Sequence, residues 1–497
     1  MKRIVSIIFF ITLVVWVNSQ TIRFNNTYDP FIYGTARSII EYGDGYIIVG
    51  GGLDSLSSPN KYELIVTCVD SIGELKWYKS FGDTIYNYYH GMHSSLKRLD
   101  NGNFIVAGAR ANNEIYAGVL YMFDENFDTL WMKTYFEDTT GTIFYNCIEA
   151  YDGGFLLVGA SKDDLMGGVL EHSDVILVKT DINGNMEWAK RYGGDNLDWG
   201  FQVEKTFDNG YLLGGYTMSF GIVAPGHRGE WYVVKIDSLG NQQFEQHYGN
   251  PNYDDGFLSD ILPTSDSSYL FIGSKAIYYD VFPYYQGRII KFKEGEGVIW
   301  DKLYGNITLG TTFVSIIELE DNSLVATHIE QEYSNRSFLR KFTSEGDSLW
   351  IRSYDAQGCT YDQILTQVIQ TEDKGFAIAG YGYVDQKIWV VKTDSLGCDS
   401  VGGCDYTFIN ENILPEGKGM VLYPNPANKH VKCQMSNVRC QMLGVVQIYD
   451  IQGRKRIEIR DFDLEGEIDV SGLGNGIYFV RVIVGTKVFS EKLVIQR

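Results

Sequence analysis

The sequence lacks the motifs of most enzyme and nucleic-acid-binding classes. It contains no GxSxG nucleophile motif, no phosphate-binding P-loop and no HExxH zinc motif. Its seven cysteines form no CxxC pair, and no cysteine–histidine cluster has zinc spacing. Basic residues are few, because 42 lysines and arginines stand against 63 aspartates and glutamates, and the net charge of −21 would repel nucleic acid. We therefore expect no metal, no cofactor and no nucleic-acid partner.

Long apolar runs are also missing, except at the N-terminus. Lys2 and Arg3 precede an apolar run from Ile4 to Val17, and small and polar residues follow it. This is the pattern of a secretory signal peptide, and the run is too short for a membrane span. We expect residues 1–19 to be removed, with no transmembrane segment in the mature chain. Export permits disulfides, and Cys398 and Cys404 lie close together in a glycine-rich segment, so we expect them to be bonded.

What the chain has in quantity is glycine and aromatic residues, with 54 glycines and 35 tyrosines, a composition that favours an all-β protein. A polar turn followed by an apolar strand occurs seven times at spacings of 51 to 58 residues. The copies begin at Asp44, Asn101, Asp152, Asp208, Asp266, Asp321 and Asp373. Each unit reads as four short strands, and no segment has sustained helical periodicity. The pattern predicts a seven-bladed β-propeller over residues 20–397.

The stretch "ILVKTDINGNMEWAKRYGG", Ile176 to Gly194, is the outer hairpin of one predicted blade. Asn183-Gly184 suits the positive φ of a tight turn, and an aromatic residue in the last strand can wedge against the next blade. These aromatic residues are Trp77, Trp131, Trp188, Phe244, Trp300 and Trp350. The seventh unit has a third strand near Trp389 but no fourth. We therefore expect residues 21–28 to supply the missing strand and close the ring.

The C-terminal segment differs in composition from the rest. After a linker at 398–416, residues 417–497 hold 12 basic and 8 acidic residues, and strands alternate with turns. We expect a small β-sandwich. The motifs "VLYPNPANKHV", "VVQIYDIQGRK", "GLGNGIYFVRV" and a terminal "KLVIQR" follow in order.

These motifs resemble the type A C-terminal sorting domain of cargo for the type IX secretion system of Bacteroidota. The resemblance implies Sec export, passage through the outer membrane with the type IX machinery as partner, and release or attachment at the outer cell surface. The residues that carry the resemblance as a sorting signal are Pro424, Asn425, Pro426, Gly476, Tyr478, Lys492, Leu493 and Val494.

The loops between the fourth strand of one unit and the first strand of the next gather at one end of a propeller. They carry aromatic and acidic residues, which suit stacking on a sugar or a cationic ligand. The candidate ligand-binding residues are Tyr88, Tyr89, Tyr145, Asp198, Trp199, Tyr253, Asp254, Asp255, Tyr361 and Asp362. The alternative is that these residues only pack one blade against the next.

No residue is assigned a catalytic role. Asp254 and Asp255 are adjacent, so in a strand they would face opposite ways and make a poor glycosidase pair. His90 and His93 form HxxH without an evident third ligand. We expect a non-catalytic protein that binds glycan or protein at the cell surface. A surface glycan hydrolase or lyase and a purely structural surface protein remain as alternatives.

Overall fold

The computed structural model describes residues 22–29, 33–53, 61–112, 115–136, 141–162, 173–220, 229–249, 256–279, 282–305, 310–331, 335–356, 362–382, 386–400, 420–435, 443–450, 452, 454–463, 467–484 and 487–496. Within these ranges the chain forms β-strands and no helix. Accordingly, no helix in the described part of the chain is long and apolar enough to cross a membrane. The predicted signal peptide, residues 1–19, lies outside the described residues.

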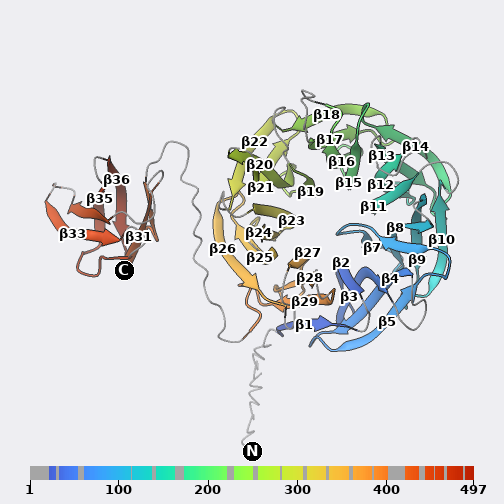
Figure 1. Ribbon diagram of the computed structural model, residues 1–497, viewed down its shortest axis with the longest axis horizontal. Coiled ribbons are helices and arrows are strands. Elements are labelled where there is room, and N and C mark those ends of the chain that lie inside the picture. The colour runs from blue at the N-terminus through green and yellow to red at the C-terminus, as the bar shows by residue number, and fades with distance from the viewer. Residues whose placement is uncertain are drawn as a thin grey trace, which may run out of the picture.

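Seven sheets form a closed ring in chain order (Figure 1). Blade 1 is β2 (Tyr33–Tyr42), β3 (Gly45–Leu53), β4 (Tyr62–Asp70) and β5 (Leu75–Phe81); blade 2 is β6 (Asn87–His90), β7 (Leu96–Arg98), β8 (Phe104–Asn112), β9 (Ile115–Phe123) and β10 (Thr129–Tyr135); blade 3 is β11 (Thr142–Glu149), β12 (Phe155–Lys162), β13 (Ser173–Thr180) and β14 (Met186–Tyr192); blade 4 is β15 (Asp198–Lys205), β16 (Tyr211–Thr217), β17 (Glu230–Ile236) and β18 (Gln242–Tyr248); blade 5 is β19 (Leu258–Pro263), β20 (Tyr269–Tyr279), β21 (Phe282–Lys293) and β22 (Gly297–Tyr304); blade 6 is β23 (Gly310–Glu318), β24 (Leu324–Gln331), β25 (Asn335–Phe342) and β26 (Ser348–Tyr354); blade 7 is β27 (Gln363–Gln370), β28 (Phe376–Gly382), β29 (Ile388–Thr393) and β1 (Phe24–Tyr28).

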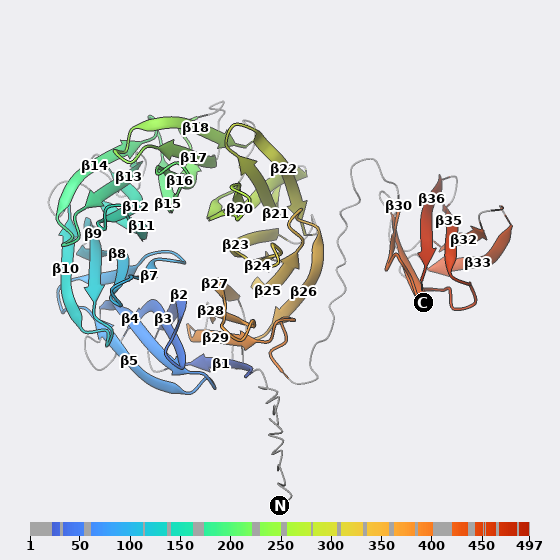
Figure 2. The same cartoon turned by 180° about the vertical axis from the view of Figure 1, so that it is seen from behind.

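The predicted seven-bladed propeller is confirmed. Each blade is an antiparallel meander whose first strand faces the centre of the ring and whose last strand forms the rim, as both views show (Figures 1 and 2). In blade 2 the first strand is split, because β6 and β7 both pair with β8 and Gly91 to Ser95 lie between them.

A repeated clamp joins neighbouring blades at the rim, and it explains why the outer hairpin recurs in the sequence. The Trp188 ring of blade 3 lies against Gly240 in the outer turn of blade 4, where a Cβ would come within 2.8 Å of it. The Tyr192 hydroxyl donates to the Gly240 carbonyl at 2.7 Å, and Lys190 Nζ donates to the Leu239 carbonyl. The same tyrosine-to-glycine bond joins Tyr135 to Gly184, Tyr304 to Gly346 and Tyr354 to Gly397.

The turn of this hairpin depends on one glycine and one aspartate. In the Asn183-Gly184 pair, only Gly184 has a positive φ, at 73°. Asp181 Oδ1 accepts the Asn183 and Asn185 amides, so its carboxylate is used to hold the turn.

The ring closes through the N-terminal strand, as the repeat pattern predicts. β1 pairs antiparallel with β29, with Phe24 opposite Lys392 and Tyr28 opposite Ile388. Phe24 lies against Gly73 of blade 1, and the Tyr28 hydroxyl donates to the Gly73 carbonyl at 2.7 Å. Phe24 and Tyr28 therefore supply the clamp that the seventh unit lacks in its own sequence.

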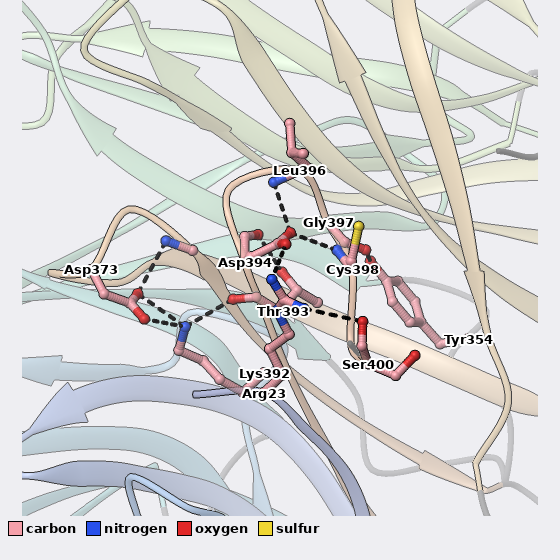
Figure 3. Close-up of polar contacts among 11 residues, drawn as sticks. Arg23, Tyr354, Asp373, Lys392, Thr393, Asp394, Leu396, Gly397, Cys398 and Ser400 are labelled. Carbon is pink, nitrogen blue, oxygen red and sulfur yellow. Dashed lines mark hydrogen bonds and ion pairs between the residues drawn. The ribbon is translucent and has the colours of Figure 1, made fainter. Parts of the chain in front are cut away.

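Ion pairs reinforce this junction (Figure 3). Arg23 lies 2.7 Å from Asp394, and Lys392 Nζ lies 2.9 Å from Asp373 Oδ2. The second pair belongs to a series in which a buried lysine of the third strand meets the aspartate of the first turn. The other members are Lys179 with Asp152, Lys235 with Asp208, and Lys291 with Asp266, at 2.5 to 2.8 Å. Buried ammonium groups in this propeller are thus neutralised by carboxylates of their own blade.

The C-terminal domain consists of two small sheets. One is β30 (Met420–Tyr423), β31 (His430–Met435) and β34 (Glu467–Asp469); the other is β32 (Leu443–Asp450), β33 (Lys455–Asp463), β35 (Gly476–Val484) and β36 (Lys487–Ile495). Its core includes Val431, Val446, Val480 and Leu493, all fully buried. The predicted C-terminal β domain is confirmed.

Candidate functional site

The candidate site lies at the end of the ring where the first strand of each blade begins. Because each blade is an antiparallel meander, the second strand ends and the third strand begins at that same end. We call it the entry end. Of the residues predicted from the sequence, Tyr89, Tyr145 and Trp199 lie near the entry-end starts of β6, β11 and β15.

Aromatic rings follow one another around the entry end from blade 1 to blade 5. We call the set of Tyr62, Tyr89, Tyr116, Tyr145, Trp199, Phe201, Tyr216 and Phe257 the aromatic arc. Tyr62 stacks on Tyr89 at 5.4 Å, and Tyr89 meets Tyr116 at 5.8 Å. In blades 3 to 5, Phe201 contacts Tyr145, Trp199 and Phe257 at 5.3 to 6.1 Å, and Tyr216 contacts Phe257 at 4.7 Å. Phe257 is 45% exposed, so the arc presents a ring to solvent.

A β-bulge places several of these side chains. Tyr145, Phe201 and Arg37 are each the extra residue of a bulge in the first strand of their blade, at β11, β15 and β2. A bulge lets one residue leave the ladder and turns its side chain away from the neighbouring pattern. Arg37 therefore occupies in blade 1 the position that arc residues occupy in blades 3 and 4.

A polar cluster adjoins the Tyr62 end of the arc. The Tyr62 hydroxyl lies 3.0 Å from Thr35 Oγ1 and 3.4 Å from His90 Nε2, and His90 Nδ1 lies 2.6 Å from the Gly91 carbonyl. Burial, together with the nearby Arg37, lowers the pKa of His90 to about 4. At neutral pH the imidazole is uncharged. Burial raises the pKa of Tyr62, and Thr35 and Arg37 oppose that rise.

Other predicted residues serve the structure or lie elsewhere. Tyr88 is buried, and its hydroxyl donates to Asp83 at 2.7 Å. Asp198 is buried and accepts hydrogen bonds from Gly194 and Ser219; burial raises the pKa of its carboxyl. Asp362 accepts the Asn335 amide at 2.6 Å. Tyr253, Asp254, Asp255 and Tyr361 lie outside the described residues.

The sequence pattern did not indicate five of the eight arc residues, nor Arg37. Tyr62, Tyr116 and Tyr216 are on second or third strands, whose ends reach the entry end although they are distant in sequence from the loops between units. Phe201 and Arg37 were missed because a bulge cannot be located by alternation alone. An apolar or cationic residue followed by Ser, Asn or Gln in the middle of a first strand could have marked it.

Below the arc, one polar side chain per blade forms an inner belt. Its members are Ser38, Ser95, Asn146, Gln202, Asp260, Ser315 and Gln367. Gln367 accepts the Ile39 amide at 2.8 Å, and Asp260 accepts the Ile316 amide at 3.1 Å. These bonds satisfy the free inner edges of the first strands, which have no further strand to pair with.

His93 belongs to this belt, whereas His90 does not. His93 is buried, with its Nε2 2.7 Å from Gln202 Nε2 and 3.7 Å from Asp260 Oδ1. The two histidines of the HxxH motif thus have separate partners. In the part of the chain that the structure describes, no three His, Cys, Asp or Glu side chains are grouped as metal ligands.

The predicted sorting residues meet in the C-terminal domain. Asn425 Nδ2 donates to the Lys492 carbonyl at 2.7 Å, and Asn425 Oδ1 accepts the Val494 amide at 2.8 Å. Two residues further, the Ala427 amide donates to the Val494 carbonyl at 2.8 Å. Tyr478 lies opposite Leu493, and Gly476 lies opposite Ile495, in the pairing of β35 with β36. The loop around Asn425, with Pro424 and Pro426 exposed, therefore holds the last strand by its backbone.

Cys398 is buried and disulfide-bonded. Cys404 lies outside the described residues, so its bond to Cys398 stays a prediction. Cys68 and Cys147 are free thiols, and burial raises the pKa of Cys68 to about 11 and that of Cys147 to about 12.

Comparison with known families assigns the C-terminal domain. Residues 421–496 match the family described as secretion system C-terminal sorting domain. The chain is therefore cargo of the type IX secretion system, which exports it to the cell surface or beyond and is its partner in transport. No curated protein matches the chain.

Solved structures give distant matches. A polysaccharide lyase described as an ulvan lyase is 9% identical with a TM-score of 0.46, covering 76% of this chain and 95% of its own. A protein of unknown function from Bacteroides caccae is 10% identical with a TM-score of 0.36, covering 63% of this chain and 94% of its own. PorZ, a surface component of the type IX secretion system of Porphyromonas gingivalis, is 9% identical with a TM-score of 0.24, covering 95% and 100%.

Proposed function

We propose that the propeller binds glycan outside the cell through the aromatic arc. The observation that carries this proposal is the presence of two groups of contacting rings at the entry end. One group runs from Tyr62 to Tyr116 in blades 1 and 2, and the other runs from Tyr145 to Phe257 in blades 3 to 5. Aromatic faces stack well on the apolar faces of sugar rings, while hydroxyls such as that of Tyr62 can bond sugar hydroxyls. Phe201 and Tyr216 are buried and pack against Phe257 of the next blade, so the rings available for stacking are the partly exposed members of the arc, above all Phe257.

The proposal includes the route and the division of the chain. Residues 1–19 would direct Sec export, residues 20–397 form the binding propeller, residues 398–416 link the domains, and residues 417–497 direct the second step through the outer membrane. The mature protein is then secreted or attached to the outer cell surface. A surface location gives a glycan-binding site direct access to polysaccharide.

The test is binding to a glycan array by the wild-type chain and two matched alanine variants. Phe257 in the arc is 45% exposed, and Phe207 at the opposite end of the ring is 54% exposed and contacts Tyr269. Phe257→Ala should weaken binding by about 1 kcal/mol, or roughly fivefold, because one stacking face is lost. Phe207→Ala should leave binding unchanged. Equal effects of the two variants, or no glycan bound at all, would contradict the proposal.

A glycan lyase is the second candidate, and the Tyr62–His90 cluster is the observation that favours it. A neutral imidazole such as that of His90 can accept the proton from the carbon next to a uronate carboxylate, a phenol such as that of Tyr62 can donate a proton to the departing glycosidic oxygen, and an arginine can stabilise the charge on the carboxylate. The raised pKa of Tyr62 opposes its use as a base. Release of unsaturated uronate, followed by ultraviolet absorbance, would establish this activity, and Tyr62→Phe should abolish it.

A further inference from the structure

We infer that the ligand of the aromatic arc is an anionic saccharide, and that Arg37 binds its carboxylate or sulfate group. This inference rests on the proposed glycan-binding function and adds the chemical class of the ligand. It comes from the contrast between Arg37 and the buried lysines of the propeller.

Arg37 is half-buried, and no carboxylate of the described residues pairs with its guanidinium. Among the described residues no ion pair or hydrogen bond joins this group to another side chain, and its Nε is buried without a hydrogen-bond partner. Buried Lys179, Lys235, Lys291 and Lys392 each meet an aspartate within 2.9 Å. Burying an unpaired charge is costly, so the missing partner needs an explanation.

A shortage of carboxylates does not explain why Arg37 is unpaired. The chain has 63 acidic residues, and its aspartates are placed systematically beside buried lysines in four blades. The neighbours of Arg37 in the described part of the chain are instead neutral. Its Cζ lies 5.0 Å from the centre of the Tyr381 ring, and the Tyr62 hydroxyl and the uncharged His90 are its electrostatic neighbours. Blade 1 thus keeps a cation beside the arc without neutralising it.

The geometry of Arg37 suits an oxyanion. Arg37 Cζ lies over the Tyr381 ring, and Nε is buried, so the two terminal NH2 groups are the donors that a ligand could reach. Two parallel N–H···O bonds from these groups are the arrangement preferred by carboxylate and sulfate groups. Its bulge position is equivalent to those of Tyr145 and Phe201. A saccharide stacked along the arc would therefore bring a charged substituent within reach of Arg37 at the blade 1 end.

The net charge of −21 does not prevent this recognition. At physiological ionic strength, charges more than about 8 Å apart are largely screened, so the nearby guanidinium dominates the field felt by a bound anion. A neutral saccharide would leave the guanidinium unpaired. The anionic saccharide should bind about 10- to 100-fold more tightly, the range expected for a charge-assisted hydrogen bond in a partly desolvated site.

The experiment compares four full-length chains on an array that carries uronate-bearing, sulfate-bearing and neutral oligosaccharides. The chains are wild type, Arg37→Gln, Arg37→Lys and Arg98→Gln. Arg98 is the matched control, because it lies over the Tyr42 ring at 5.1 Å but is exposed on β7, away from the arc. Calorimetry with tetragalacturonate, a carrageenan tetrasaccharide and cellotetraose then quantifies the three classes and separates a carboxylate ligand from a sulfate ligand.

We expect wild type and Arg98→Gln to bind acidic oligosaccharides with the same affinity. Arg37→Gln should bind them about 10- to 100-fold more weakly. Arg37→Lys should retain part of the affinity, with an unchanged melting temperature. Acidic ligands that bind Arg37→Gln as well as wild type, or an array that yields only neutral ligands, would overturn the anion assignment while leaving glycan binding in place. An array without any ligand would overturn the glycan proposal and this inference with it.

Discussion

Closure of the ring can be tested by truncating one side chain, Phe24. Its ring is 7% exposed, lies against Gly73 and contacts Tyr46 at a centroid distance of 6.2 Å. Phe24→Ala removes this ring from the junction between blade 7 and blade 1. Substitutions of this kind cost about 3–5 kcal/mol, and the lower end applies because the site is near the rim and can partly collapse.

The expected shift in melting temperature follows from the size of the propeller. With an unfolding entropy of about 2.1 cal/mol/K per residue, a unit of about 370 residues changes by about 1.3 °C per kcal/mol. Phe24→Ala should therefore lower the propeller transition by about 4 °C. Differential scanning calorimetry of the full chain measures it. Deletion of residues 21–28 should lower the transition further, because the clamp bond of Tyr28 and the pairing with β29 are also lost.

The matched control is Phe244→Ala, which alters the equivalent aromatic position at a junction where the chain is continuous. Both variants should lower stability, Phe244→Ala by less because its ring is only half-buried. Only Phe24→Ala should accelerate proteolysis at the N-terminal strand, because only there is the outer strand held without a covalent link to its blade. A Phe24→Ala melting temperature within about 1 °C of wild type would correspond to a loss of less than about 1 kcal/mol. That result would refute the reasoning.

Four further predictions concern other parts of the chain. The folded-state pKa of His90, about 4, lies below the usual value of 6.5, so its contribution to stability is present above pH 6.5 and lost as pH falls towards 4. From pH 7 to pH 5 this loss is about 2 kcal/mol. Over the same pH range, the free energy of unfolding of His90→Gln, measured with denaturant, should fall by about 2 kcal/mol less than that of wild type. Asn425→Ala removes two hydrogen bonds to the last strand, so amide exchange there should become at least about tenfold faster, and unchanged exchange would contradict the role assigned to Asn425. Peptide mapping without reduction should find Cys398 bonded to Cys404; finding both thiols free would refute the bond. A chain without residues 417–497, made in a heterologous host, should keep the cooperative unfolding transition of the propeller. In the native cell the same truncated chain should accumulate in the periplasm, whereas normal amounts outside the cell would show that export does not need this segment.

The all-β class, the seven units and the N-terminal closing strand follow from the sequence, because turns and strands repeat at a near-constant spacing and each strand is a local feature. The absence of a fourth strand after Trp389 was itself informative, since an open edge needs a partner. The sorting residues were also predictable, because their order along the last 80 or so residues is a local pattern. In the structure Asn425 and Val494 are in contact, although 69 residues separate them.

The composition of the candidate site was decided by the tertiary structure. Loops between units are expected to provide it, but the arc draws Tyr62, Tyr116 and Tyr216 from second and third strands, because every strand of an antiparallel meander has one end at the entry end. Register shifts of one residue turned Arg37 and Phe201 out of their ladders, and alternation along a strand carries no record of such a shift. Charge pairing also depends on the tertiary structure. The sequence shows many aspartates and lysines, but only the folded blades place the aspartates beside the buried lysines. The same fold places Arg37 beside Tyr381, Tyr62 and His90, with no carboxylate partner among the described residues.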